Sequence, residues 1–157
     1  MGALTMGMWK AAIAEIYRIL VPGGWAEFVE AQARFPDVGP QSRKLGMFLE
    51  DMFRDKPLLV DCQTHIPILL QEAGLMNIHT EPRRVPLGRS AGQDGIDGSN
   101  NFADVFTAMK TPMLQAGGYG YVKDEEQFDQ LIADTKEEWL ASDSNIPFYT
   151  IYAQKPL

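Results

Sequence analysis

Residues 15–30 read EIYRILVPGGWAEFVE, and within this stretch the chain passes from a helix through a tight turn into a strand. Between residues 4 and 20 apolar side chains recur three and four positions apart, which predicts a helix with one buried face. The Pro-Gly-Gly sequence at 22–24 ends that helix. Trp25–Ala31 then combines aromatic and β-branched residues with partial alternation, which predicts a strand. A helix turned directly into an apolar strand constrains the chain to a fold that packs helices on a sheet.

The middle of the chain continues this mixture of helices and strands. Residues 41–55 carry apolar positions at helical spacing and predict an amphipathic helix. A further helix is expected to begin with Asp61 as its N-cap and to end at Gly74. The segment 76–88 is expected to form a strand at a sheet edge, because Pro82 cannot donate a ladder hydrogen bond.

The C-terminal part adds two helices and one strand. The polar, glycine-rich segment Gly88–Ser99 predicts a flexible loop. Residues 102–114 present an apolar helical face, and Asp124 is expected to cap an acidic helix. Residues 146–156 have good strand propensity. The fold class is therefore α/β, with about three strands and about five helices.

Length and composition exclude several classes of protein. A chain of 157 residues fits a single domain over 1–157, and 45% hydrophobic residues predict a packed core. The net charge of −7 argues against nucleic-acid partners, which require basic surfaces. The lone Cys62 permits no internal disulfide, and no apolar stretch is long enough to span a membrane. We expect an intracellular, cytoplasmic location without membrane or nucleic-acid partners.

Four segments carry a resemblance to a known family. They are E-x-x-R-x-L-x-P-G-G at 15–24, LLQEAGLMNIH at 69–79, VPLG at 85–88 and FYTIYAQKP at 148–156. In this order they resemble the second half of class I S-adenosylmethionine-dependent methyltransferases, of the type found in fungal natural-product and secondary metabolism. The resemblance covers nearly all of this sequence but only about the last half of that family's domain.

The resemblance implies both a sheet order and a missing cofactor site. The three strands would correspond to the family's fifth, sixth and seventh, in the order 5-7-6, with the last strand antiparallel between the other two. The family's cofactor lies against its leading strands, which this sequence does not match. The glycines of Gly88–Gly98 follow a late strand and lack the strand–turn–helix context of a nucleotide-binding loop. We therefore expect no bound cofactor and no metal, and a homodimer formed along the bare edge Trp25–Ala31.

Two residues are candidates for catalysis. Glu30 lies at the carboxyl end of the first strand, where open α/β sheets bind ligands, and would act as a general acid or base if apolar neighbours raise its pKa. Gln32 lies beside it and is a candidate for binding substrate. His65, near Asp61 and Cys62, is a second acid–base candidate. The structural alternatives are a solvated carboxylate for Glu30 and a capping or surface role for His65.

A set of aromatic and methionine side chains is the candidate substrate pocket. In the family that the sequence resembles, this helical region covers the substrate site. Such residues at helical spacing also form ordinary protein cores. The candidates are Phe102, Phe106, Met109, Met113, Tyr119 and Tyr121.

Three functions are consistent with these features. The first is a cofactor-independent isomerase, cyclase or dehydratase that acts on an apolar, polyketide-like intermediate. The second is a methyltransferase fragment that is active only with a complementing chain. The third is a non-catalytic module that binds a partner through its sheet edge. We favour the first, because the region resembling the family is the part that would hold substrate.

Overall fold

The computed structural model describes residues 4–32, 35–54 and 58–157. These residues form six α-helices, two short 3₁₀ segments and three strands, which confirms the α/β class with one helix more than expected. The helices are α1 (Met6–Ile19), α2 (Pro40–Arg54), α3 (Cys62–Glu72), α4 (Gly92–Ala108), α5 (Lys110–Gln115) and α6 (Glu125–Leu140). The strands are β1 (Trp25–Ala31), β2 (Met76–Pro86) and β3 (Asn145–Gln154), and the 3₁₀ segments are η1 (Arg89–Ala91) and η2 (Gly117–Gly120).

The described residues divide into two compact units. The first comprises residues 4–32, 58–84 and 147–157, and the second comprises residues 35–54 and 85–146. The first unit holds α1, α3 and most of the sheet. The second holds the remaining helices.

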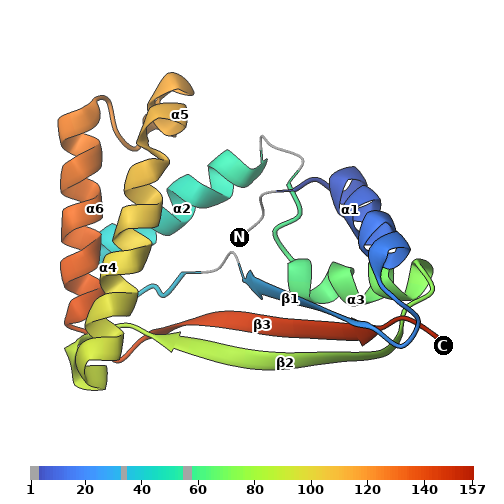
Figure 1. Cartoon of the computed structure of the whole chain (residues 1–157). Helices are drawn as coiled ribbons and strands as arrows, with labels where there is room; N and C mark the ends of the chain where they lie inside the picture. The colour runs from blue at the N-terminus through green and yellow to red at the C-terminus, as the bar shows by residue number, and fades with distance from the viewer. Residues whose placement is uncertain (1–3, 33–34, 55–57) are drawn as a thin grey trace. The chain divides into compact units, whose positions relative to one another are not determined.

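The sheet has the order β1-β3-β2, as the resemblance implied. β1 pairs antiparallel with β3 from Trp25 opposite Gln154 to Ala31 opposite Phe148. β3 also runs opposite to β2 (Figure 1). The prediction of β2 as an edge strand is confirmed, and Pro82 lies within it. Every strand pairing of this sheet therefore includes β3.

One face of the sheet is covered by α1 and α3, which lie on the same side of β1 and β3 (Figure 1). Trp9 of α1 meets Phe28 of β1 edge-to-face, with ring centroids 6.1 Å apart. From α3, Ile66 and Leu70 are fully buried in the same cluster. Ile151 of β3 is also fully buried there. Burial of such side chains contributes roughly 1.5–3 kcal/mol each, so this cluster is the main stabilising feature of the first unit.

Contacts from the residues just after β3 hold the turn between α1 and β1. Gly23 adopts a φ of 77°, and its N–H donates to the Lys155 carbonyl oxygen at 3.0 Å. The Lys155 ammonium donates to the carbonyl oxygens of Tyr17 and Leu20, each at 2.8 Å. These are carbonyls of the last turn of α1, which lack helical partners and interact favourably with a cation. The Pro-Gly-Gly sequence thus ends α1 where Lys155 provides hydrogen bonds to the last carbonyl groups of the helix.

In the second unit, α6 packs against both α2 and α4, and Figure 1 shows α4 and α6 side by side. Phe128 and Trp139 of α6 are buried, as their helical spacing predicted. Phe106 of α4 contacts the Trp139 ring at 6.1 Å, and Phe48 of α2 contacts Phe128 at 6.4 Å. Aromatic contacts from α6 to two other helices therefore form the centre of this core.

The prediction of a flexible loop over Gly88–Ser99 is wrong. The segment contains η1 and the first two turns of α4, which begins at Gly92. A Cβ on Gly95 would lie 1.9 Å from the Gly88 carbonyl oxygen, and a Cβ on Gly98 would lie 2.3 Å from that of Pro86. These glycines let the helix approach the backbone closely, so they serve packing and not chain flexibility.

The two predicted N-caps differ in their chemistry. Asp124 accepts a hydrogen bond from the Gln127 N–H at 2.9 Å and caps α6 as expected. Asp61 occupies the N-cap position of α3, but its side chain makes no capping hydrogen bond. Asp61 has a φ of −101° and a ψ of 53°, outside the extended conformation that a capping residue normally adopts.

A carboxylate from α6 caps the start of α2. The Gln41 N–H donates to one oxygen of Glu138 at 2.9 Å, and the Ser42 N–H and hydroxyl each donate to the other at 2.7 Å. Burial alone would raise the pKa of Glu138, but these hydrogen bonds outweigh it and lower the pKa below 4.5. Gly39 is required beside this contact, because a Cβ there would lie 2.3 Å from the Glu138 carboxyl carbon.

Substitution of two helical glycines should have opposite effects. Gly98→Ala places a methyl group against the Pro86 carbonyl and should lower the free energy of unfolding by about 1–3 kcal/mol. Gly46→Ala in α2 meets nothing within 4 Å and should raise it by up to about 1 kcal/mol, because alanine favours helix. Urea denaturation of both variants checks this. If the free energy of unfolding changed in the same direction for both variants, the close approach of Gly98 to the Pro86 backbone would not explain why glycine is needed there.

The Glu138 cap predicts a pH-dependent stability. Because its folded-state pKa lies below 4.5, the ionised form stabilises the fold above that pH, and the stabilisation is lost as the pH falls through the folded-state pKa. Glu138→Gln should therefore cost about 2 kcal/mol at neutral pH and less at pH 3, because protonation of the carboxylate removes the charge from the cap. Urea denaturation at both pH values measures this.

The neighbouring residue provides the matched control for that measurement. Glu137 is exposed and pairs with Arg89 at 3.0 Å, so Glu137→Gln should cost less than about 1 kcal/mol at either pH. Equal losses for Glu138→Gln at neutral and acidic pH would contradict an ionised cap.

Candidate functional site

The predicted catalytic and binding residues of the first unit lie on two elements. Glu30 is half-buried near the carboxyl end of β1 and stands opposite Tyr149 of β3. Gln32 follows β1, is half-buried, and donates its backbone N–H to the Pro147 carbonyl oxygen at 3.0 Å. Strand alternation directs Glu30 to the same face as Phe28, the face that α1 and α3 cover.

His65 lies in the first turn of α3 and is half-buried. Its predicted neighbour Cys62 is fully buried, and the thiol donates to the Leu59 carbonyl oxygen at 3.1 Å. His65 lies on α3, whereas Glu30 lies on β1. The two acid–base candidates thus come from different elements, and their roles stay predictions.

Three of the pocket candidates belong to the packed core of the second unit. Phe102, Phe106 and Met113 are 2%, 1% and 0% exposed. Both phenylalanine rings meet Phe35 edge-to-face, with centroids 6.3 and 4.9 Å away. A molecule bound among these side chains would have to displace this packing.

The two tyrosine candidates gather around Phe48. Tyr119 and Tyr121 lie with ring centroids 5.9 and 5.3 Å from it, and Tyr121 is stacked. The Tyr121 hydroxyl donates to Asp51 at 2.8 Å, and this hydrogen bond, with burial, raises the pKa of Tyr121. Met109 is the half-buried C-cap of α4. All six pocket candidates thus lie in the second unit, whereas Glu30, Gln32 and His65 lie in the first.

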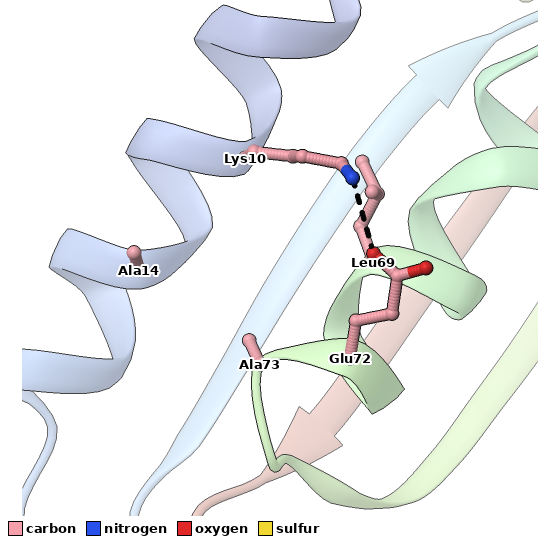
Figure 2. A pocket seen from close by; sticks show the side chains of 5 residues that line it. All are labelled: Lys10, Ala14, Leu69, Glu72 and Ala73. Carbon is pink, nitrogen blue, oxygen red and sulfur yellow. Dashed lines mark ion pairs between the residues drawn. The ribbon is translucent and has the colours of Figure 1, made fainter.

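A hollow of about 200 Å³ opens between α1 and α3 (Figure 2). Ala14, Leu69 and Ala73 line it, and Lys10 and Glu72 form an ion pair of 3.3 Å across it. Its volume is below the usual range for small-molecule sites, and its two charged groups neutralise one another. This hollow is a notch left by two small side chains and has no chemistry of its own.

The other face of the sheet carries a larger hollow, of about 350 Å³, which sequence reasoning missed. Trp25, Ala26, Glu27 and Tyr152 line it. Trp25 and Tyr152 have ring centroids 5.8 Å apart and planes inclined at 52°. Alternation in β1 already indicated that Trp25 and Glu27 share a face, but only the β1–β3 register places Glu27 opposite Tyr152.

Tyr152 is held from its other side by β2. His79 stacks on its ring at 5.0 Å, and the Tyr152 hydroxyl donates to Glu81 at 2.8 Å. This hydrogen bond raises the pKa of Tyr152 and, with the charge of Arg83, lowers that of Glu81. The tyrosine ring is therefore fixed in place with its hydroxyl directed to a carboxylate.

No group of three or more histidine, cysteine, aspartate or glutamate residues in 4–32, 35–54 and 58–157 is arranged to hold a metal ion. Among the same residues, no helix has both the length and the apolar character needed to cross a bilayer.

Comparison with known proteins gives similarity at the level of structure alone. No protein-family model matches the sequence, and no curated protein matches it significantly. Phosphoethanolamine N-methyltransferase 2 of Haemonchus contortus, solved with phosphomonomethylethanolamine and S-adenosylhomocysteine, is 15% identical with a TM-score of 0.43. The same enzyme solved with S-adenosyl-L-methionine is 15% identical with a TM-score of 0.44. Each covers 94% of this chain, which spans 30% of that chain's length. At these scores the likeness assigns neither a family nor an activity.

Proposed function

We propose that the chain is the substrate-side half of a methyltransferase-type α/β domain and that a second copy completes its sheet along β1. The order β1-β3-β2 with β3 antiparallel in the centre supports this, because it is the order that the sequence resemblance implies. The observation that carries the proposal is β1 itself. In the described part of the chain β1 has one strand neighbour, and its residues Trp25 and Val29 are 50% and 56% exposed.

The hydrogen-bond pattern identifies which groups of β1 are open to a partner. The Gln32 N–H donates to Pro147, and the Lys155 N–H donates to Gly24, so the even-numbered residues of β1 face β3. The backbone groups of Trp25, Glu27 and Val29 therefore point away from the sheet. An exposed row of this kind is a template for strand pairing.

The opposite edge of the sheet, β2, is less suited to pairing with a further strand. The Leu87 N–H donates to Ser144 at 2.8 Å, so odd-numbered positions of the β2 segment face β3 and even-numbered positions face outward. Pro82 and Pro86 occupy outward positions, where a proline removes the donor that a further strand would need. The β2 edge therefore lacks two of its outward donors, whereas no proline interrupts the β1 edge.

In the proposed dimer, a second copy would pair with the β1 edge in a register that avoids like charges opposite each other. A two-fold axis beside Phe28 pairs Glu27 of one copy with Val29 of the other, and Trp25 with Ala31. This register keeps the two Glu27 carboxylates from standing directly opposite each other, which would be unfavourable. Self-complementarity of this kind is what a two-fold interface requires.

For the activity, the proposal is proton transfer without a cofactor on an apolar, polyketide-like intermediate. Glu30 would take a proton from one carbon and return it at another as the double bond shifts, so that isomerisation needs no co-reactant. The half-buried place of Glu30 near the carboxyl end of β1 supports this role. Cyclisation or dehydration would use the same group, with His65 as a second acid–base group.

The alternative activity is S-adenosylmethionine-dependent methyl transfer after assembly with a complementing chain. The methyltransferase-type strand order is the observation that favours it. A third reading, a non-catalytic module, shares the β1 edge but assigns no role to Glu30. Ligand binding and turnover separate the three.

Val29→Pro should abolish the dimer without unfolding the chain. The substitution removes an outward N–H and leaves the β1–β3 hydrogen bonds intact, because proline is tolerated at such edge positions. Sedimentation velocity at micromolar concentration should show a dimer for the wild type and a monomer for the variant. Val29→Thr keeps both the N–H and the branched side chain and should remain dimeric. A monomeric wild type, or a dimeric proline variant, would rule out pairing through β1.

Calorimetric titration with S-adenosylmethionine tests the cofactor-independent activity. The chain alone should bind no S-adenosylmethionine. Saturable turnover of a polyene or polyketide precursor should fall at least about 100-fold in Glu30→Gln, because the variant cannot transfer the proton. His65→Ala should lower turnover as well, and Glu15→Gln, a change of the same type on α1, should have no effect. Melting temperatures verify folding. Micromolar binding of S-adenosylmethionine would favour methyl transfer, and neither binding nor turnover would leave only the non-catalytic module.

A further inference from the structure

The hollow on the open face of the sheet is lined by two aromatic rings and a carboxylate. Two aromatic rings, Trp25 and Tyr152, have centroids 5.8 Å apart and planes inclined at 52°. Glu27 supplies a carboxylate beside them, opposite Tyr152 across the β1–β3 pair. The hollow that these residues line has a volume of about 350 Å³, enough for a small organic group.

We infer that this hollow binds a methylated ammonium group, with the Trp25 and Tyr152 rings against its methyl surface and the Glu27 carboxylate as its counter-ion. Aromatic faces attract cations, and paired rings are the usual recognition element for quaternary ammonium. The site differs from the proposed catalytic position at Glu30, because alternation places Glu27 and Glu30 on opposite faces of β1. It does not depend on the proposed activity.

The chemistry of the lining selects among cations. A primary ammonium would lose hydrogen bonds to water on entering, and Glu27 is the sole ionised side chain lining the hollow among the described residues. A methylated ammonium has no such hydrogen bonds to lose, and its apolar surface suits indole and phenol rings. The hydrogen bond from the Tyr152 hydroxyl to Glu81 keeps that ring oriented and rich in electrons.

The charges around Tyr152 are compatible with a cation at the hollow. Glu81 lies at the tyrosine hydroxyl, and Arg83 is engaged by Glu81 in an ion pair. His79 stacks on Tyr152 from the β2 side. The chain as a whole carries a net charge of −7, which raises the local concentration of cations.

Tryptophan fluorescence gives a direct test. Trp25 is 50% exposed, whereas Trp9 and Trp139 are 7% and 1% exposed, so a ligand on the open face should perturb Trp25 alone. Tetramethylammonium chloride should change the fluorescence saturably, with a Kd of millimolar order (about −4 kcal/mol). tert-Butanol, a neutral molecule of similar size, and sodium chloride at equal ionic strength should give no saturable change.

Substitutions in the hollow, and a peptide that contains a methylated lysine, test which groups form the site and which ligand it prefers. Tyr152→Leu should abolish the response, and Glu27→Gln should weaken binding by about 3–10-fold. Tyr152→Phe, which keeps the ring, should retain most of it. Titration with Nε-trimethyl-lysine in a short peptide distinguishes a lysine-borne group from a free ammonium by its higher affinity.

Three results would overturn the inference. They are equal responses to tetramethylammonium and tert-butanol, an unchanged affinity in Glu27→Gln, or no saturable response in a wild type whose melting temperature shows it to be folded. None of these results bears on turnover or on S-adenosylmethionine binding, so failure here and failure of the proposed activity are separable.

Discussion

The pairing of β3 with both other strands is the interaction on which the sheet depends. β1 and β2 are separated along the sequence by two helices, and neither pairs with the other. Each finds its ladder partner in β3, whose Ile151 and Ala153 are fully buried against α1 and α3. A strand from the end of the sequence therefore fixes the register of the earlier ones, including which side of β1 carries Trp25 and which carries Glu30.

Charged side chains distant in sequence complete helix ends in both units. Lys155 satisfies the last carbonyls of α1, and Glu138 satisfies the first N–H groups of α2. In each case the charge has the sign that the helix dipole favours. Local capping residues explain α6 through Asp124 but not these two ends. These long-range contacts therefore help to fix where α1 ends and where α2 begins, which local helix propensity alone would not define.

Sequence reasoning succeeded where a local rule decides the structure. The bounds of β1 follow from its composition and the preceding Pro-Gly-Gly, and β2 is an edge strand because Pro82 cannot donate to a ladder. It failed at Gly95 and Gly98, because glycine indicates chain freedom locally whereas here it permits close packing. The Trp25–Tyr152 hollow could not be foreseen either, since it exists only once β3 pairs with β1. The roles of Glu30 and His65 stay predictions.

The two edges of the sheet differ in a way that limits the size of any assembly built from it. Pro82 and Pro86 remove donors from the outer side of β2, whereas β1 keeps a full outer row. Under the proposed pairing through β1, the outer edges of the pair would be the two β2 strands, each with proline at two outward positions. Proline at these positions weakens the pairing of a further strand, so the proposed assembly would favour a pair over the extended stacking that leads to fibrils.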